Sequence, residues 1–321
     1  MLTVNQKSRP EIVKPEYFFW TALAASLFLL FGPPPIVSPT PAAATFVLGT
    51  VPQNPFESVE LSAKAAFVYD LRARRKIYGK SEREVLPLAS LTKIMTAATA
   101  LALVPETTYV TVDAQALEEE GDNGLRAGEQ WLLRDILKFM LIESSNDAAV
   151  AVAAAVGQTL GKGMGHETRA ARALFVAEMN GLSHRLGFRS TAFANETGLD
   201  VDERTAGAYS TAEEAALLLA HALTQFPEVL RETRSSELTL RNQVGELRPA
   251  ENTNKDTNRF PLLLASKTGY TDLAGGNLVV AFDAGFNRPI VVVVLGSTAD
   301  GRFTDTERLV WAAVEFLTRN K

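Results

Sequence analysis

Cysteine is absent from all 321 residues of the chain, and histidine occurs only three times. Without cysteine there is no disulfide bond, no thiolate nucleophile and no cysteine-based metal site, and its absence suits an oxidising compartment. The histidines, His166, His184 and His221, are never four residues apart, the spacing that puts two metal ligands on one face of a helix. The sequence therefore predicts no metal site and no cofactor.

A basic excess is also missing. The formal net charge is −5. Since residues 1–56 hold three basic and two acidic side chains (+1), the remainder carries −6. A nucleic-acid partner is not expected, because no basic surface is available to release counterions from phosphates.

Long hydrophobic runs are scarce, and the one near the amino terminus is short. Residues 17–37 are uncharged, with an apolar core at Tyr17–Phe31, and they follow a polar stretch that contains three basic residues. Such a segment directs export across a membrane. It is shorter than the roughly 20 residues of a spanning helix, and Gly32–Pro35 would end it. It fits a membrane anchor, a signal peptide cleaved near Ala42–Ala44, or a buried core helix, and we favour the anchor.

The chain divides into three regions by composition. Residues 1–37 are predicted to form a cytoplasmic tail with the anchor or signal peptide, and residues 38–58 a spacer rich in Pro and Ala. Residues 59–321 are predicted to form one folded body, with no second domain after it. We expect this body on the extracytoplasmic face of the cytoplasmic membrane, or secreted or periplasmic if the segment is cleaved.

Strand patterns stand at both ends of this body, with helical patterns between them. Alternation at 65–70, followed by 76–79 after a short charged turn, predicts a hairpin, and apolar runs separated by turn residues predict strands at 262–269, 277–285 and 289–297. Helical periodicity predicts helices at 90–103, 133–141, 146–156, 172–187 and 210–223. Ser210 with Glu213, and Thr304 with Glu307, have the spacing of capping boxes, the second for a final amphipathic helix. One sheet built from distant segments is therefore expected.

The first chemical motif is Ser90-Leu91-Thr92-Lys93, which opens an apolar helical stretch. Residues three apart are neighbours on a helix, so Lys93 is expected beside the Ser90 hydroxyl. A desolvated lysine near another cation is neutral enough to activate a serine as a nucleophile. Taken alone, the motif is explained more simply by Ser90 capping the helix.

The second motif is Ser144-Ser145-Asn146, a polar break between two apolar helical stretches. A hydroxyl can relay a proton, and a side-chain amide can hold a peptide carbonyl. These residue types also serve as an N-cap for a helix beginning at Asp147. We expect both roles, since one residue can cap a helix and line a cleft.

The third motif is Lys267-Thr268-Gly269-Tyr270-Thr271, at the end of an apolar strand. Lysine and threonine at a strand edge suit a carboxylate, and glycine lets another backbone approach closely. Alone, the motif fits a solvated strand end equally well.

Together and in this order, the motifs resemble the S-x-x-K, S-D-N and K-T-G set of class A β-lactamases and penicillin-binding proteins. The sequence resembles most closely the D-alanyl-D-alanine carboxypeptidase family of low-molecular-mass penicillin-binding proteins, peptidase family S11. The similarity lies at 63–101, 141–153, 193–203 and 267–281 and covers about residues 60–321.

The resemblance implies an α+β fold of the serine β-lactamase and penicillin-binding transpeptidase type. Its antiparallel sheet would come from both chain ends, with a helical subdomain inserted. Residues 59–321 would be the catalytic domain of a bacterial serine-type D-Ala-D-Ala carboxypeptidase. Its substrates would be peptidoglycan stem peptides ending in D-Ala-D-Ala, and β-lactams would be covalent inhibitors.

The resemblance also assigns the catalytic residues. Ser90 would attack the carbonyl of the penultimate D-Ala, Lys93 would accept its proton, and Ser144 would relay a proton to the leaving D-Ala. The backbone N–H groups of Ser90 and Tyr270 would form the oxyanion hole.

Four further residues would bind substrate or shape its site. Asn146 would hold the substrate amide, and Lys267 would orient the Ser144 hydroxyl and add positive charge. Thr268 would bind the terminal carboxylate, and Gly269 belongs to the same substrate-binding strand.

The sequence departs from the family in three places. Ser145 replaces a common glycine, which is expected to alter the cleft wall. The β-rich second domain and the C-terminal membrane helix of many members are not found. Residues 252–259 are polar where members often carry apolar residues. Lys255 or Arg259 could contact substrate there, although exposed loop charges are the simpler interpretation.

Three alternatives stay open. A D-alanyl endopeptidase acting on peptidoglycan cross-links has the same motifs. A class A β-lactamase needs a deacylating glutamate, for which Glu178 is the nearest candidate, but Glu178 lies in a helical pattern without the asparagine expected four residues later. An inactive binding module is disfavoured, because all three motifs are intact.

Overall fold

The computed structural model describes residues 54–121, 124–161, 168–285 and 287–320, which belong to one compact unit, Pro52–Lys321. The export segment predicted at 17–37 lies outside the described residues. Within the described residues, no helix is long and apolar enough to span a bilayer.

The described elements form a main sheet, several short strand pairs and a group of helices. The strands are β1 (Ala65–Asp70), β2 (Arg75–Lys80), β3 (Leu86–Pro87), β4 (Tyr109–Thr111), β5 (Gln130–Leu132), β6 (Ala192–Phe193), β7 (Ala208–Ser210), β8 (Glu237–Arg241), β9 (Leu247–Glu251), β10 (Leu263–Thr271), β11 (Gly275–Asp283) and β12 (Pro289–Ser297). The α-helices are α2 (Thr92–Leu103), α3 (Leu133–Glu143), α4 (Asn146–Leu160), α5 (Thr168–Arg185), α6 (Ala212–Gln225), α7 (Pro227–Arg231) and α8 (Gly301–Arg319). Short 3-10 turns are η1 (Pro55–Ser58), η2 (Ala89–Leu91), η3 (Ala114–Glu118), η4 (Glu232–Arg234) and η5 (Thr257–Arg259).

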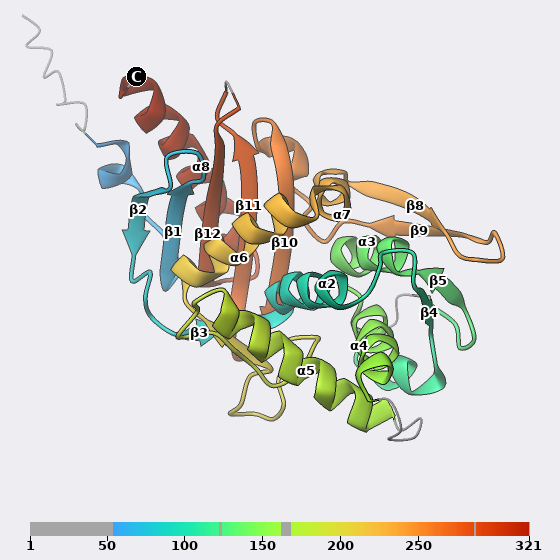
Figure 1. The fold of residues 1–321 in the computed structure, drawn as a ribbon. Coiled ribbons are helices and arrows are strands. Elements are labelled where there is room, and N and C mark those ends of the chain that lie inside the picture. Colours follow the sequence, from blue (N-terminus) through green and yellow to red (C-terminus); the bar gives the residue numbers. More distant parts are fainter. Residues whose placement is uncertain (1–53, 122–123, 162–167, 286, 321) are drawn as a thin grey trace, which may run out of the picture. The chain divides into compact units, whose positions relative to one another are not determined.

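Five antiparallel strands form the main sheet in the order β10-β11-β12-β1-β2 (Figure 1). The β1–β12 pair joins the two ends of the body, in register from Ala65 opposite Leu295 to Asp70 opposite Ile290. Helices α2 to α7 lie between these strands in the sequence. The predicted sheet from both chain ends, with inserted helices, is therefore confirmed. It leaves β10 as an edge strand.

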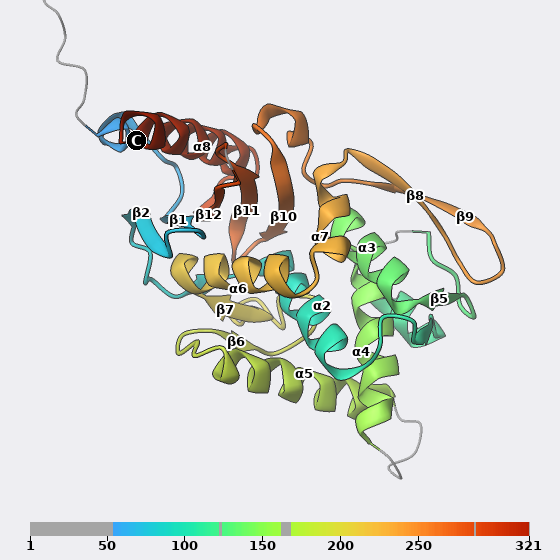
Figure 2. The ribbon, with the colours of Figure 1, turned by 45° about the horizontal axis from the view of Figure 1, so that its top comes forward.

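Alternate residues of the sheet enter two different cores, as the period of a strand dictates. Val68, Val280 and Val292 pack with α8, whereas Phe67 and Val293 pack into the core shared with α2 to α6. Figure 2 shows α6 and α8 on opposite faces of the sheet. The sheet is thus buried on both sides, which explains the continuous apolar runs of its strands.

The helical group is packed through small side chains. Helix α4 is rich in alanine, and almost every residue of its first three turns is buried. At Gly157 a Cβ atom would lie 2.0 Å from the carbonyl oxygen of Ala171 in α5, so only glycine permits this approach of the two helices.

Both predicted capping boxes are wrong by one to four residues. Ser210 belongs to strand β7, and Thr211 caps α6 by accepting a hydrogen bond from the Glu214 N–H at 3.1 Å. Ser210 with Glu213 and Thr211 with Glu214 both have capping-box spacing, and the pairing of Ser210 in β7 leaves Thr211 as the cap. Helix α8 has Asp300 at its N-cap and begins at Gly301, so Thr304 lies inside the helix.

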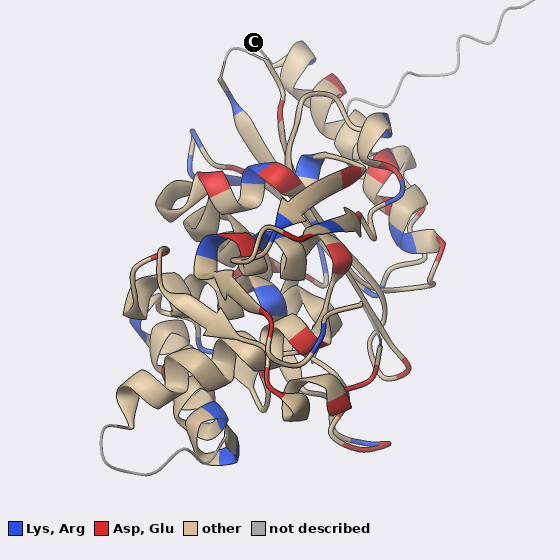
Figure 3. Ribbon diagram, turned by 90° about the vertical axis from the view of Figure 1, so that its right-hand side faces the viewer, with Lys and Arg blue, Asp and Glu red and all other residues tan. Residues whose placement is uncertain are grey.

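One residue of the predicted spacer packs into the folded body. Phe56 is buried and stacks on Tyr78 with ring centroids 4.7 Å apart. On the face drawn in Figure 3, basic and acidic residues are interspersed. An ion pair between exposed side chains contributes about 0–1 kcal/mol to the free energy of unfolding.

Candidate active site

Ser90 lies in the turn η2, between β3 and α2, and is half-buried. The preceding Ala89 has φ 49°, a left-handed conformation that costs a non-glycine residue of order 1–3 kcal/mol. The Ala89 carbonyl accepts a 2.7 Å hydrogen bond from the Thr92 hydroxyl, and Gly198 packs directly against it. Because α2 begins at Thr92 with Leu91 at its N-cap, Ser90 is not a helix cap. The contacts of Ala89 fix the turn that presents Ser90.

The amino group of Lys93 is buried beside this hydroxyl. Its Nζ lies 3.0 Å from the Ser90 Oγ, 2.6 Å from the Asn146 Oδ1 and 2.8 Å from the Thr197 carbonyl oxygen. A neutral amine has two N–H donors and one lone pair. The two carbonyl oxygens can accept from the donors, and the lone pair can then accept from the Ser90 hydroxyl. The three oxygen atoms thus accommodate a neutral amine as well as an ammonium with three donors, and the pKa of Lys93 decides between these forms.

Burial acts on the pKa of Lys93 in the same direction. Removal from water lowers it from 10.5 to about 7, although nearby Glu196 and Glu119 oppose this shift. A substantial fraction of Lys93 is therefore neutral near pH 7. Lys93 thus lies beside the Ser90 hydroxyl as its spacing predicts, and desolvation is the main cause of its lowered pKa.

Ser144 ends α3 in the left-handed conformation, with φ 60°. Its hydroxyl accepts a 2.8 Å hydrogen bond from the Nζ of Lys267, which also donates to the Thr268 carbonyl at 2.9 Å. Burial lowers the pKa of Lys267 well below its ordinary value, and the charges of Lys93 and Arg302 add to this effect. The second hydroxyl of the site is thus oriented by a second buried lysine.

Asn146 and Ser145 divide the two roles predicted for this motif. Asn146 accepts from Lys93 through Oδ1, and its Nδ2 donates to the Glu120 carbonyl at 2.6 Å. Ser145 is fully buried, and its hydroxyl caps α4 by accepting from the Ala148 N–H at 3.1 Å. Ser145 therefore supports the helix instead of altering the cleft wall, and α4 begins at Asn146, the first residue of the helical pattern at 146–156.

Strand β10 places the third motif against the nucleophile turn. A Cβ atom on Gly269 would lie 2.9 Å from the Leu88 carbonyl oxygen and 3.2 Å from the Ser90 nitrogen. The absence of a side chain thus allows the two backbones to approach. Tyr270 follows with its side chain 52% exposed. Side chains engage part of the backbone of this edge strand, since the Ser266 N–H donates to the Thr233 hydroxyl at 3.0 Å and the Gly269 carbonyl accepts from Arg302 at 2.7 Å.

Asn277 on β11 fixes this arrangement from behind. Its Nδ2 donates to the Pro87 carbonyl at 2.9 Å, and its Oδ1 accepts from the Gly296 N–H at 2.8 Å. The side chain is fully buried. It thereby ties the sheet to the segment just before Ser90.

Two residues at the site were missed by sequence analysis. The carbonyl of Thr197, within the similarity at 193–203, contacts Lys93. Thr253 lies 2.6 Å from Thr268, hydroxyl to hydroxyl. The polarity of residues 252–259 was the only signal for Thr253, and that signal directed attention to Lys255 and Arg259.

Charged candidates from the sequence lie elsewhere. Arg259 forms ion pairs of 3.3 Å with Asp256 and Glu307, so its guanidinium is engaged with its own segment and with α8. Glu178 lies on α5, 38% exposed, and pairs with Arg185 at 3.7 Å. The helical position expected for Glu178 is confirmed.

The residues predicted for the site therefore come together. Lys93 joins Ser90 and Asn146, and Lys267 joins Ser144 and the main chain of Thr268. Residues 50–299 match the sequence profile of the D-alanyl-D-alanine carboxypeptidase family, peptidase family S11. The chain belongs to this family.

Individual relatives of this S11 member carry two kinds of name. D-alanyl-D-alanine carboxypeptidase DacF of Bacillus subtilis is 29% identical over 254 residues, which are 77% of this chain and 61% of the relative. The D-alanyl-D-alanine endopeptidase of Escherichia coli is 30% identical over 281 residues, which are 84% of this chain and 83% of the relative. This chain thus spans about three fifths of the Bacillus protein.

A solved structure confirms the predicted fold class. Penicillin-binding protein D2 of Listeria monocytogenes, in an ampicillin-bound form, superposes with a TM-score of 0.63 at 28% identity. The match covers 79% of this S11 chain and 98% of the Listeria chain.

The burial of Lys93 predicts how acylation of this S11 member depends on pH. Lys93 is protonated below its pKa of about 7 and neutral above it, so the rate of Ser90 acylation by a penicillin should rise through this region. Between pH 5 and pH 8 we expect an increase of about 10²-fold, since each pH unit below the pKa reduces the neutral fraction about tenfold. Lys93→Arg should lose the reaction at every pH. A rate that stays constant from pH 5 to 8 would contradict this role of Lys93.

Proposed function

We propose that this chain is a serine-type D-Ala-D-Ala carboxypeptidase that trims peptidoglycan stem peptides and is acylated by penicillins. The observation that carries the proposal is the buried Nζ of Lys93, 3.0 Å from the Ser90 Oγ and bonded to two carbonyl oxygens. The S11 family match supports it. The names of the Bacillus and Listeria relatives point in the same direction.

The first step of this proposal is acylation of Ser90. Lys93 takes the hydroxyl proton as Ser90 Oγ attacks the carbonyl carbon of the penultimate D-Ala. The N–H groups of Ser90 and Tyr270 stabilise the oxyanion, and the close approach of β10 at Gly269 supports this pairing. The C–N bond then breaks, and Ser144, held by Lys267, passes its hydroxyl proton to the departing amine and regains one from the Lys93 ammonium, so that the Ser90 proton leaves with D-Ala. Water next hydrolyses the ester and restores Ser90.

Substrate is held on both sides of this bond in the proposal. Asn146 holds the peptide amide, and Thr268 binds the terminal carboxylate near the positive charge of Lys267. The Thr253 hydroxyl lies 2.6 Å from that of Thr268, and when Thr253 donates to Thr268, the Thr268 proton is free to donate to a carboxylate oxygen. A free carboxylate is the group that distinguishes a carboxypeptidase substrate from an internal peptide bond.

Product masses separate the proposed carboxypeptidase from the endopeptidase. Purified muropeptides with pentapeptide stems should lose one alanine, because the carboxylate site at Thr268 and Thr253 receives a chain end. Mass spectrometry of the products is the measurement. The endopeptidase alternative keeps a specific basis in the name and 83% coverage of the Escherichia coli relative. Splitting of cross-linked dimers with pentapeptides left intact would replace our proposal with that alternative.

The lifetime of the penicilloyl ester separates it from a β-lactamase. Glu178 lies on α5 and pairs with Arg185 at 3.7 Å, and the buried carboxylate of Glu196 is engaged by Arg172 at 2.6 Å. Without a positioned base for water, hydrolysis is slower by about 10²- to 10⁴-fold. The tethered leaving nitrogen of a penicillin also keeps water out, whereas D-Ala diffuses away. Intact-mass spectrometry should therefore show the adduct for minutes or longer.

Two results would decide this test. Ser90→Ala should prevent the adduct from forming at all. Rapid return to the unmodified mass, with many penicillins consumed per enzyme, would favour the β-lactamase.

We also propose that the body acts outside the cytoplasmic membrane, carried there by residues 17–37. The uncharged run and the basic residues before it support this location. Protease added to spheroplasts should then digest residues 59–321. Protection of this body while the membrane stays intact would contradict the proposal.

A further inference from the structure

Lys93, which contacts the Ser90 hydroxyl, and Asn146, which contacts Lys93, are both held by carbonyl groups outside the three motifs. Lys93 donates to the Thr197 carbonyl, and Asn146 donates to the Glu120 carbonyl. Main-chain acceptors are only as well placed as the loops that contain them. The positions of Lys93 and Asn146 therefore depend on what fixes residues 195–199 and 119–120.

The loop at 195–199 is bonded internally and to helix α2. Asn195 accepts from the Gly198 N–H at 2.7 Å and donates to the Leu199 carbonyl at 2.9 Å. The Thr96 hydroxyl of α2 donates to the Glu196 carbonyl at 2.7 Å. These contacts shape the loop, whereas its side chain Glu196 connects it to a more distant helix.

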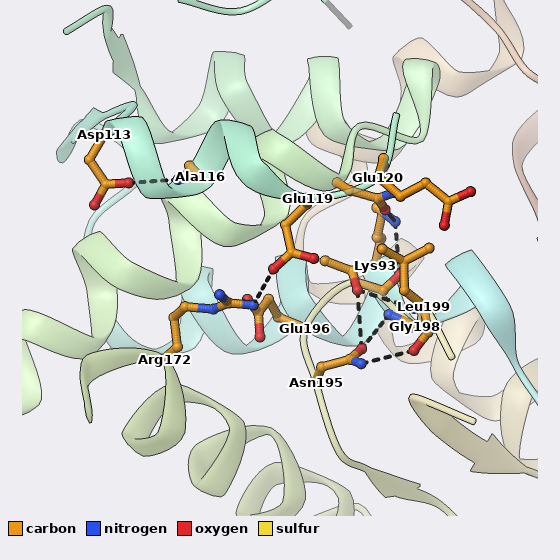
Figure 4. Close-up of polar contacts among 12 residues, drawn as sticks. Lys93, Asp113, Ala116, Glu119, Glu120, Arg172, Asn195, Glu196, Gly198 and Leu199 are labelled. Atoms are coloured by element: carbon orange, nitrogen blue, oxygen red, sulfur yellow. Dashed lines mark hydrogen bonds and ion pairs between the residues drawn. The ribbon is translucent and has the colours of Figure 1, made fainter. Parts of the chain in front are cut away.

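Arg172 on α5 joins both loops. Its Nε donates to the Glu196 Oε1 at 2.6 Å, and its Nη2 donates to the Glu119 Oε1 at 2.8 Å. Figure 4 shows this guanidinium between the two carboxylates, with Lys93 on the far side of Glu196. The Glu196 side chain is 1% exposed and those of Arg172 and Glu119 are under one third exposed. A planar guanidinium can hold two carboxylates in fixed directions at once.

We propose that Arg172 is a positioning residue that holds, through Glu196 and Glu119, the two loops on which Lys93 and Asn146 rest. This inference rests on the proposed function of Ser90 and Lys93. Arg172 touches neither the nucleophile nor its base. Its effect on acylation passes through Glu196 and Thr197 to Lys93, and through Glu119 and Glu120 to Asn146.

The same pairs control the charge around Lys93. The negative charges of Glu196 and, less strongly, Glu119 act to raise the pKa of Lys93 and so oppose the larger lowering by burial. Lys267 lies on the β10 side. Arg172 compensates one of the two negative charges and keeps Glu196 in place. Since burial alone raises the pKa of Glu196, loss of Arg172 would disturb position and charge together. Substitution of the glutamates separates the two effects.

The first test removes the guanidinium and measures the rate of Ser90 acylation by a fluorescent penicillin. Arg172→Met should lower this rate by about 10²-fold, the scale expected when reacting groups shift by about 1 Å. Arg172→Lys keeps the positive charge but cannot hold two carboxylates in a plane, so its acylation rate should lie between those of the parent protein and Arg172→Met. Arg169→Met is the matched control, because Arg169 lies one turn earlier on α5, lines one surface cavity together with Arg172, and is outside the ion pairs of Glu119 and Glu196. Equal rates for Arg172→Met and Arg169→Met would overturn the proposal.

The second test removes charge while keeping shape, and it does not depend on acylation. Lysines labelled with ¹⁵N at Nζ, in a Ser90→Ala background, report the titration of Lys93, with Lys93→Met identifying its signal. Glu196→Gln should move the midpoint to lower pH, Glu119→Gln should move it less, and Arg169→Met should leave it in place. An unchanged midpoint in Glu196→Gln would overturn the link to Lys93. If the midpoint moves but the parent protein never forms a penicillin adduct, the proposed function fails and the positioning role stands. This test also decides the question if Arg172→Met does not fold.

Discussion

The burial of one lysine amino group is the constraint on which the rest of this structure depends. A charged ammonium taken from water without compensation costs several kcal/mol, so a buried lysine either finds partners or becomes neutral. Lys93 has two carbonyl acceptors and one hydroxyl around it, a set that a neutral amine satisfies fully. Burial destabilises the charged form of Lys93, so more of the amine is neutral near pH 7 and free to accept the proton of Ser90.

The architecture supplies the components of this environment from distant parts of the chain. Helix α2 provides Lys93, the junction of α3 and α4 provides Asn146, and a loop after α5 provides the Thr197 carbonyl. The sheet closes the other side, because Gly269 on β10 lies against the Ser90 turn and Asn277 ties β11 to Pro87. No single element could desolvate Lys93 alone. The inserted helices and the sheet are therefore both needed for the chemistry. The proposed positioning residue Arg172 contributes to the same environment from α5.

Local sequence was sufficient for the parts that depend on spacing and period. Ser90 and Lys93 are three residues apart, and the strands at both ends of the body follow from their apolar runs. The capping box at α6 was placed one residue early because Ser210 and Thr211 both satisfy the pattern, and only the pairing of β7 shows that Ser210 belongs to the strand. Thr197 acts through a carbonyl that every residue has, so its type carries no signal. The contacts of Arg172 and of Thr253 join segments separated by 24 or more and by 15 residues respectively, and no local pattern predicts such pairs.

The protonation state of Lys93 tests the central claim most directly, and neutron diffraction on deuterated crystals grown near pH 8 would show it. Our account predicts two deuterons on Nζ, directed to the Asn146 Oδ1 and the Thr197 carbonyl, with the Ser90 deuteron directed at the Nζ lone pair. Three deuterons on Nζ at this pH would contradict the account, because Lys93 could not then accept the proton of Ser90.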